Sequence, residues 1–200
     1  MNLEIVKEGT IQASVVLAMW QDYLMEIKGI KYDPENENES EQMIRQIVLK
    51  ELENTFSSSG TQIFLFKQIG CYLGFCVFGR WPNAARPGST YIQEFYITPK
   101  YRRKGYGRLA VKQLVRIYEN SPVEFFVLRK RIGARLFWRE VMAGLCYRDV
   151  SWQMCNERVR KKLDKETKWF CYIPPEPRRV SPHFFILTGP VTRRAGTAYA

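Results

Sequence analysis

The stretch EFYITPKYRRKGYGRL, residues 94–109, decides the fold of this chain of 200 residues. It opens with an alternating apolar segment typical of a strand, passes a proline, and ends in a basic loop whose two glycines precede a helix. The first turn of a helix has unpaired N–H groups and the positive end of the helix dipole. The loop adds four cationic side chains: Arg102, Arg103, Lys104 and Arg108. It is therefore predicted to bind a phosphate or pyrophosphate, with the glycines letting the backbone approach the ligand.

Two other interpretations of this loop stay open. It is either a basic surface turn before an ordinary helix, or a dinucleotide fingerprint, because Gly105, Gly107 and Ala110 fit G-x-G-x-x-A. That fingerprint follows its strand almost directly, whereas a polar stretch, residues 98–104, intervenes here. Residues 129–131 are Arg-Lys-Arg, where a ribose-binding acid would be expected.

The stretch resembles the acetyl-CoA signature of the GCN5-related N-acetyltransferases, a strand E-x-x-V-x-P followed by [QR]-x-x-G-x-[GA] at a helix start. Arg102, Gly105 and Gly107 occupy the three defined positions of the second part. The family's second signature is matched at four further positions, which are Leu128, Ala134, Phe137 and Gly144. The resemblance covers about residues 3–173.

Two positions depart from the second signature. Arg131 stands where the family has an asparagine that contacts the pantetheine arm, and Trp138 stands where a tyrosine often protonates the departing thiolate. The run Phe137-Trp138-Arg139 resembles a poorly characterised bacterial subgroup of the family. Trp138 either contacts the cofactor or packs in the core, and the general acid is left unidentified.

The resemblance implies direct transfer of an acetyl group from acetyl-CoA to an amine, without a covalent enzyme intermediate and without a metal. The pyrophosphate would lie on the backbone N–H groups of residues 103–108, and the pantetheine arm beside residues 95–97, with an N–H near Ile97 facing the acetyl carbonyl. The residues expected to bind the cofactor are Phe95, Ile97, Arg102, Arg103, Lys104, Gly105, Tyr106, Gly107, Arg108, Arg131 and Trp138.

Two residues of the same strand are expected to be catalytic. Glu94 is the candidate base that removes a proton from the amine, since the amine must reach the thioester uncharged. The alternative for Glu94 is an exposed or ion-paired strand carboxylate. Tyr96, together with Tyr91, is expected to shape the pocket or relay protons, and the alternative for both is packing.

The hydrophobic pattern predicts a single α/β (α+β) domain, with a mixed, mostly antiparallel central sheet flanked by helices. The expected order is β-α-α-β-β-β-α-β-α-β-β. The expected elements span residues 3–8, 10–28, 40–54, 62–68, 71–81, 90–98, 107–120, 123–128, 132–143, 147–154 and 168–173. Residues 1–173 form the acetyltransferase-like domain, and residues 174–200 form a tail containing proline and arginine.

Charge is unevenly distributed along the chain. The net charge is +11, but residues 1–60 hold 5 basic and 11 acidic residues, and residues 61–200 hold 26 and 9. The five cysteines include no C-x-x-C pair, so we expect reduced thiols packed in the core of a cytoplasmic protein. No apolar stretch approaches the roughly 20 residues that span a bilayer, and no membrane partner is expected.

The acceptor remains open on sequence alone. Five carboxylates in residues 31–41 could attract a cationic amine, of a small molecule or a protein, and the alternative is a solvated loop. Basic residues at 158–162 and in the tail would suit phosphates of RNA, which is not the favoured partner. The two alternatives to an enzyme of this kind are a non-catalytic acyl-CoA-binding module and an RNA-directed acetylase or RNA binder. The oligomeric state, monomer or homodimer, is left open.

Overall fold

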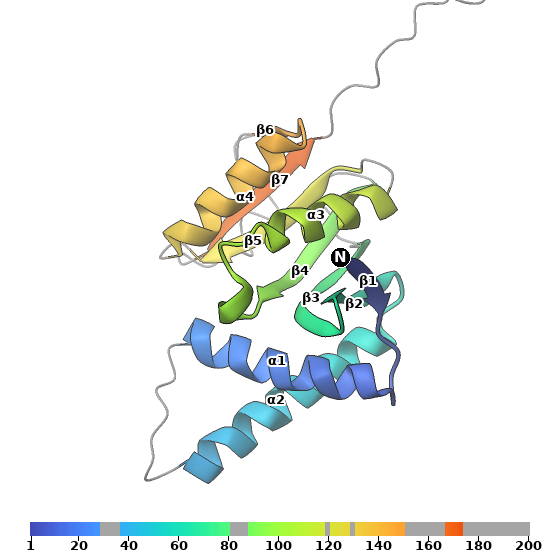
Figure 1. Cartoon of the computed structure of the whole chain (residues 1–200), viewed down its shortest axis with the longest axis vertical. Coiled ribbons are helices and arrows are strands. Elements are labelled where there is room, and N and C mark those ends of the chain that lie inside the picture. Colours follow the sequence, from blue (N-terminus) through green and yellow to red (C-terminus); the bar gives the residue numbers. More distant parts are fainter. Residues whose placement is uncertain (29–36, 81–87, 119–120, 129–130, 151–166, 174–200) are drawn as a thin grey trace, which may run out of the picture.

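The element order of the chain matches the expected one. The computed structural model describes residues 1–28, 37–80, 88–118, 121–128, 131–150 and 167–173 (Figure 1). The elements are β1 (Asn2–Ile5), α1 (Ile11–Lys28), α2 (Glu37–Ser57), β2 (Thr61–Gln68), β3 (Cys71–Arg80), β4 (Thr90–Ile97), the short 3-10 helix η1 (Pro99–Tyr101), α3 (Tyr106–Ile117), β5 (Val123–Leu128), α4 (Ile132–Gly144), β6 (Arg148–Val150) and β7 (Thr167–Ile173). The predicted fold class is confirmed.

One sheet of seven strands organises the domain, in the order β1-β2-β3-β4-β5-β7-β6. Neighbouring strands run antiparallel except β4 and β5, which are parallel and are connected through α3. A parallel pair needs such a crossover, because its two strands start at the same edge of the sheet.

Helices cover both faces of this sheet (Figure 1). On one face, α1 and α2 pack through Val16, Trp20 and Val48 against Leu65 and Phe75. On the other face, α3 and α4 form a second core whose large buried members include Phe64, Phe78, Leu114, Phe125 and Met142. The sheet therefore separates two hydrophobic layers, and residues that alternate along β4 face different ones.

Several predicted boundaries were wrong. The helix expected from residue 40 begins at Glu37, so the end of the expected acidic loop is helical; carboxylates suit a helix N-terminus, where the dipole is positive. The same helix continues to Ser57, and hydroxyls of Thr55, Ser57 and Ser58 each donate to the carbonyl four residues earlier. The strand expected at 147–154 is described only as β6, because residues 151–166 lie outside the described part.

The cysteine prediction holds for one of the three cysteines whose side chains are described. Cys76 is buried, whereas Cys71 and Cys146 are exposed, and all three are free thiols. Cys71 begins a strand directly after a turn and Cys146 follows the end of α4, so neither position reaches the core. None of the described helices combines the length and the apolar character needed to cross a membrane. The tail at 174–200 lies outside the described residues.

Candidate active site

The loop between β4 and α3 presents a row of unpaired backbone donors. Arg102 N–H donates to the carbonyl of Pro99, and Leu109 N–H donates to that of Gly105. For the six residues between them, 103–108, the described part of the chain offers the N–H groups no acceptor. Arg103 and Gly105 both have positive φ, 61° and 81°, which turns the backbone into a concave shape. Consecutive N–H groups at such a turn form an anion-binding site, and the α3 dipole adds to it.

The two glycines of the loop have different tasks. Gly105 occupies the left-handed region at the start of α3, where no side chain caps the helix. Gly107 allows close packing instead, since an added Cβ would lie 3.0 Å from two ring atoms of Phe137 on α4. The sequence predicts that both glycines let the backbone approach a ligand. The structure gives Gly107 a role in holding the α3 start against α4.

The four basic side chains of the loop do not point the same way. Arg103 and Lys104 are exposed beside the unpaired N–H groups. Arg108 is also exposed, but its guanidinium lies close to Gly144 at the C-terminal end of α4. Arg102 turns back toward α1, where it pairs with Glu26, and its Nε donates to the carbonyl of Ile97 at 2.7 Å. The guanidinium of Arg102 is thus already bound within the protein.

Next to this loop, β4 and β5 separate. They pair only at Thr90–Val123, Tyr91–Glu124 and Ile92–Phe125, although both strands are described to their ends. The N–H of Thr98 donates to Leu73 on β3, so the alternating groups of Ile97 point away from β3, toward the gap. The edge of β4 facing the gap can therefore pair with an extended ligand; the sequence predicts the pantetheine arm beside Phe95 and Ile97 of this strand.

Aromatic side chains line the α3–α4 face of the gap. Phe95 packs against Phe137 and Trp138, with ring centroids 5.8 and 5.0 Å apart. Trp138 is only 6% exposed and also packs against Phe125 at 4.4 Å. Its indole belongs to the hydrophobic core, which matches the core-packing alternative for this residue. Tyr106, also expected to bind the cofactor, is partly buried against the same core.

A β-bulge reverses the direction of the side chains along β4. Ile92 pairs with Phe78 and Glu94 pairs with the preceding residue, Val77, so Gln93 is the extra residue. Ile92 contributes to the core under α3, whereas Tyr96 contributes to the core under α1 and α2. The bulge thus places Glu94 on the α1–α2 side of the sheet, beside the gap between β4 and β5.

The surroundings of Glu94 suit a base that works near neutral pH. The pKa of its carboxyl is raised to about 7, mainly by burial. A hydrogen bond from the Tyr23 hydroxyl of α1 lowers this pKa in part, and the charge of Glu51 on α2 raises it further. Burial and the Glu94 charge also raise the pKa of Tyr23, so its hydroxyl remains a donor. Among the described residues no lysine or arginine forms an ion pair with Glu94.

The tyrosines of β4 differ in their surroundings. Tyr96 is 3% exposed, its ring lies 5.5 Å from that of Tyr23, and the guanidinium of Arg102 lies 5.4 Å from its ring centroid. Burial raises the pKa of Tyr96, and the Arg102 charge partly offsets that rise. Burial and the charges of Glu94 and Glu124 raise the pKa of Tyr91. Both tyrosines are therefore neutral at physiological pH.

Arg131 precedes α4 and joins the contacts of Arg102. Its Nη2 donates to the backbone carbonyl of Glu26, and its Nη1 lies 3.9 Å from the Glu26 carboxylate. Tyr23, Glu26 and Glu51 were missed as site residues. The only sequence feature that concerns Tyr23 is its helical spacing on the apolar face of the first helix, which does not indicate a site residue. No sequence pattern indicates that Glu26 or Glu51 lies near the site.

The expected acidic loop is only partly described. Of its five carboxylates, the side chain of Glu41 is exposed. Residues 29–36 lie outside the described part of the chain, so the structure does not connect this loop to the site.

Comparison with known proteins points to one family. Residues 17–141, more than half of the chain, match the family model described as the acetyltransferase (GNAT) family. No curated protein sequence matches the chain.

Solved structures share the fold at low sequence identity. An acetyltransferase from Thermus thermophilus is 12% identical, with a TM-score of 0.58 over 86% of this chain and 96% of that one. Tetrahymena GCN5 is 11% identical, with a TM-score of 0.57 over 88% and 99%. PaiA N-acetyltransferase from Thermoplasma acidophilum, in complex with coenzyme A, is 12% identical, with a TM-score of 0.50 over 87% and 99%. Because this family model covers more than half of the chain, and solved acetyltransferase structures share its fold, the chain belongs to the GNAT family of acetyltransferases.

Proposed function

We propose that the protein transfers an acetyl group from acetyl-CoA to the amine of a small molecule or a protein. The observation that carries this proposal is the arrangement around β4. The strand leads from Glu94 along the gap to a loop in which six N–H groups have no acceptor among the described residues. A base and an anion-binding turn thus lie at two ends of one open strand edge.

The residues present fit acetyl-CoA. Its pyrophosphate is an anion, and the N–H groups of residues 103–108 with the exposed Arg103 and Lys104 side chains would bind it. Its extended arm would pair with the edge of β4 at Phe95 and Ile97. The coenzyme A complex of the Thermoplasma acidophilum neighbour supports this choice of ligand.

Each chemical requirement has a candidate group in this chain. When bound, acetyl-CoA supplies an acetyl group whose carbon–sulfur bond breaks as a carbon–nitrogen bond to the amine forms. Glu94 accepts the proton of the amine, and a pKa of about 7 suits that task at neutral pH. The N–H of Ile97 is directed toward the gap and would stabilise the developing oxyanion. The indole of Trp138 has no acidic proton to transfer to the thiolate, which then takes one from water.

Two alternatives remain. A non-catalytic module that binds acyl-CoA would use the same loop but has no need of a carboxyl whose pKa is raised to about 7. For an RNA-directed acetylase or RNA binder, the basic segments at 158–162 and in the tail lie outside the described residues. The proposal also includes a cytoplasmic location, supported by the three described free thiols.

The experiment is release of free thiol from acetyl-CoA in the presence of a panel of amines, with calorimetric titration of acetyl-CoA alongside. Binding together with amine-dependent thiol release supports the enzyme. Binding with no thiol release for any amine supports the binding module, and absence of binding contradicts the whole proposal. Salt-sensitive binding of transfer RNA would favour the RNA-directed alternative.

A further inference from the structure

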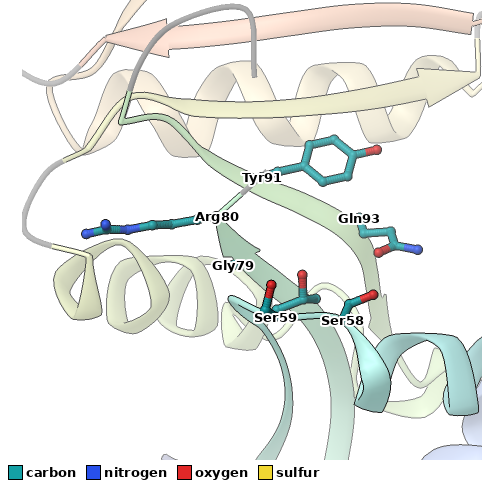
Figure 2. Close-up of a pocket in the computed structure, with 7 residues that line it drawn as sticks. Ser58, Ser59, Gly79, Arg80, Tyr91 and Gln93 are labelled. Atoms are coloured by element: carbon teal, nitrogen blue, oxygen red, sulfur yellow. The ribbon is translucent and has the colours of Figure 1, made fainter. Parts of the chain in front are cut away.

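A polar pocket opens on the α1–α2 side of the sheet, where α2 ends and β4 begins (Figure 2). Its volume is about 520 Å³, within the range of sites that hold small molecules. Besides Gly79, the residues that line it are Ser58, Ser59, Thr61, Arg80, Tyr91 and Gln93.

The pocket adjoins the candidate base. Gln93 is the extra residue of the bulge and directly precedes Glu94. Tyr91 lies close enough to Glu94 and Glu124 for their charges to raise its pKa, after the larger effect of burial. Figure 2 shows Tyr91 and Gln93 extending toward the same side of the pocket. A ligand held there would lie against Tyr91 and Gln93, the first within the influence of the Glu94 charge and the second next to Glu94 in the chain.

Arg80 does not bring its charge into the pocket. Thr61, Gly79 and Tyr91 are partners across β2, β3 and β4, so they share one face of the sheet. Arg80 follows Gly79 and therefore faces the opposite side. Burial raises the pKa of Tyr118, at the end of α3, and the charge of Arg80 lowers it, which places the guanidinium on the α3 side. In Figure 2 the guanidinium extends away from Tyr91 and Gln93.

The other polar side chains of the described lining are neutral. Hydroxyls come from Ser58, Ser59, Thr61 and Tyr91, and an amide comes from Gln93. The Ser58 hydroxyl donates to the carbonyl of Asn54, so it is left to accept a hydrogen bond from a ligand. The two charges that raise the pKa of Tyr91, after burial, are those of the Glu94 and Glu124 carboxylates. The two carboxylates favour a cationic ligand, and among the described residues no side chain brings a positive charge into the pocket to balance an anionic group.

We propose that this pocket holds the acetyl acceptor, a small amine that carries hydroxyl groups or a second amine and no carboxylate or phosphate. This inference rests on the proposed acetyl transfer, since it assigns that reaction a substrate class.

Matched amines test the substrate class. Each pair differs by one anionic group: 1,4-diaminobutane against ornithine, and glucosamine against glucosamine 6-phosphate. We expect kcat/KM for thiol release to be higher for the member without the anionic group by about tenfold or more, because like-charge contacts cost several kcal/mol. Equal or higher kcat/KM for the anionic members would overturn the inference. It would also be overturned if none of the four small amines reacted while the amine of a protein was acetylated.

Variants on adjacent serines test the place. Ser57 and Ser58 are both exposed and both donate to a carbonyl four residues earlier, but only Ser58 lines the pocket. Ser58→Trp is expected to raise KM for the amine by about tenfold, whereas Ser57→Trp leaves it unchanged and both keep the wild-type KM for acetyl-CoA. Equal effects of the two substitutions would contradict the assignment.

A third variant reverses the charge preference. Ser59→Arg puts a cation into the pocket and is expected to shift the preference toward the anionic member of each pair, which a loss of folding would not do. An unchanged preference would contradict the inference. If acetyl-CoA does not bind at all, the proposed acetyl transfer fails. If acetyl-CoA binds and amines react without these preferences, only the acceptor assignment fails.

Discussion

The guanidinium of Arg102 forms a bidentate ion pair with the carboxylate of Glu26, with N–O distances of 3.0 and 2.5 Å. Arg131 contacts the same residue twice, at the backbone carbonyl of Glu26 and at the Glu26 carboxylate. Arg102 begins the loop before α3, and Arg131 precedes α4. One carboxylate of α1 therefore pairs with an arginine from the region of each of the two family signatures. The negative charge of Glu26 therefore lies beside a site proposed for an anion.

Replacing Glu26 tests the effect of that charge. Glu26→Gln removes the ion pairs but keeps the side-chain shape, and we expect acetyl-CoA to bind about two- to fivefold more tightly, because a charge repelling the ligand is lost. Stability falls by only about 0–1 kcal/mol, since the pair is more than one-third exposed. Glu53→Gln, an exposed position of α2, is the control for the change in net charge. Weaker binding in Glu26→Gln than in the control would contradict this reasoning.

The exposed cations of the loop are expected to contribute to acetyl-CoA binding. Replacing Arg103 and Lys104 together by glutamate reverses the charge beside the unpaired N–H groups and should weaken calorimetric binding by about tenfold or more, less so at high salt. Lys112 and Arg116 are exposed farther along α3, and the same double replacement there makes an equal change in net charge. Equal losses in both double variants would mean that the loop has no special role.

Glu94 is expected to set the pH dependence of the reaction. Its pKa of about 7 means that the carboxylate, the form able to accept a proton, increases as the pH rises through that value. Thiol release is expected to rise over the same interval. Glu94→Gln should lower kcat by roughly 10²–10⁴ and remove this inflection, with acetyl-CoA binding retained. An unchanged pH profile in the variant would exclude Glu94 as the base.

The neighbours of Glu94 are expected to move its pKa in opposite directions. Glu51→Gln removes a negative charge that raises the Glu94 pKa, so the inflection should move to lower pH. Tyr23→Phe removes a hydrogen bond that lowers this pKa, so the inflection should move to higher pH. A change that merely disturbed packing would lower activity without such opposite shifts, and shifts in the same direction would contradict the described contacts.

Much of the fold follows from the sequence. The element order was predicted correctly because apolar residues repeat with helical or strand periodicity over most of the described chain. The loop after β4 was predicted because its glycines and basic residues stand at the spacing of a family signature. The spacing of Leu109, Val111 and Leu114 predicts Leu109 on the buried face of α3, but Leu109 is 46% exposed and Ala110 is buried instead. Such one-residue errors arise because periodicity fixes a face less sharply than packing does.

The surroundings of Glu94 could not be predicted in the same way. Its side chain faces α1 and α2 because Gln93 forms a bulge, and the bulge depends on the pairing register with β3. The contact between Arg102 and Glu26 joins residues 76 positions apart, which no local pattern reveals. The motif located Arg102 correctly in the loop, but the direction of its side chain depends on these tertiary contacts.

The central claim is that the bound acetyl group reaches an amine. The most direct measurement uses acetyl-CoA labelled with a heavy isotope in the acetyl group. The protein is incubated with this acetyl-CoA and 1,4-diaminobutane, and the products are identified by mass spectrometry. We predict that the label appears on the amine, with one free coenzyme A thiol for each acetylated product. Intact acetyl-CoA that stays bound to the protein, or labelled free acetate without labelled amine, would contradict the account.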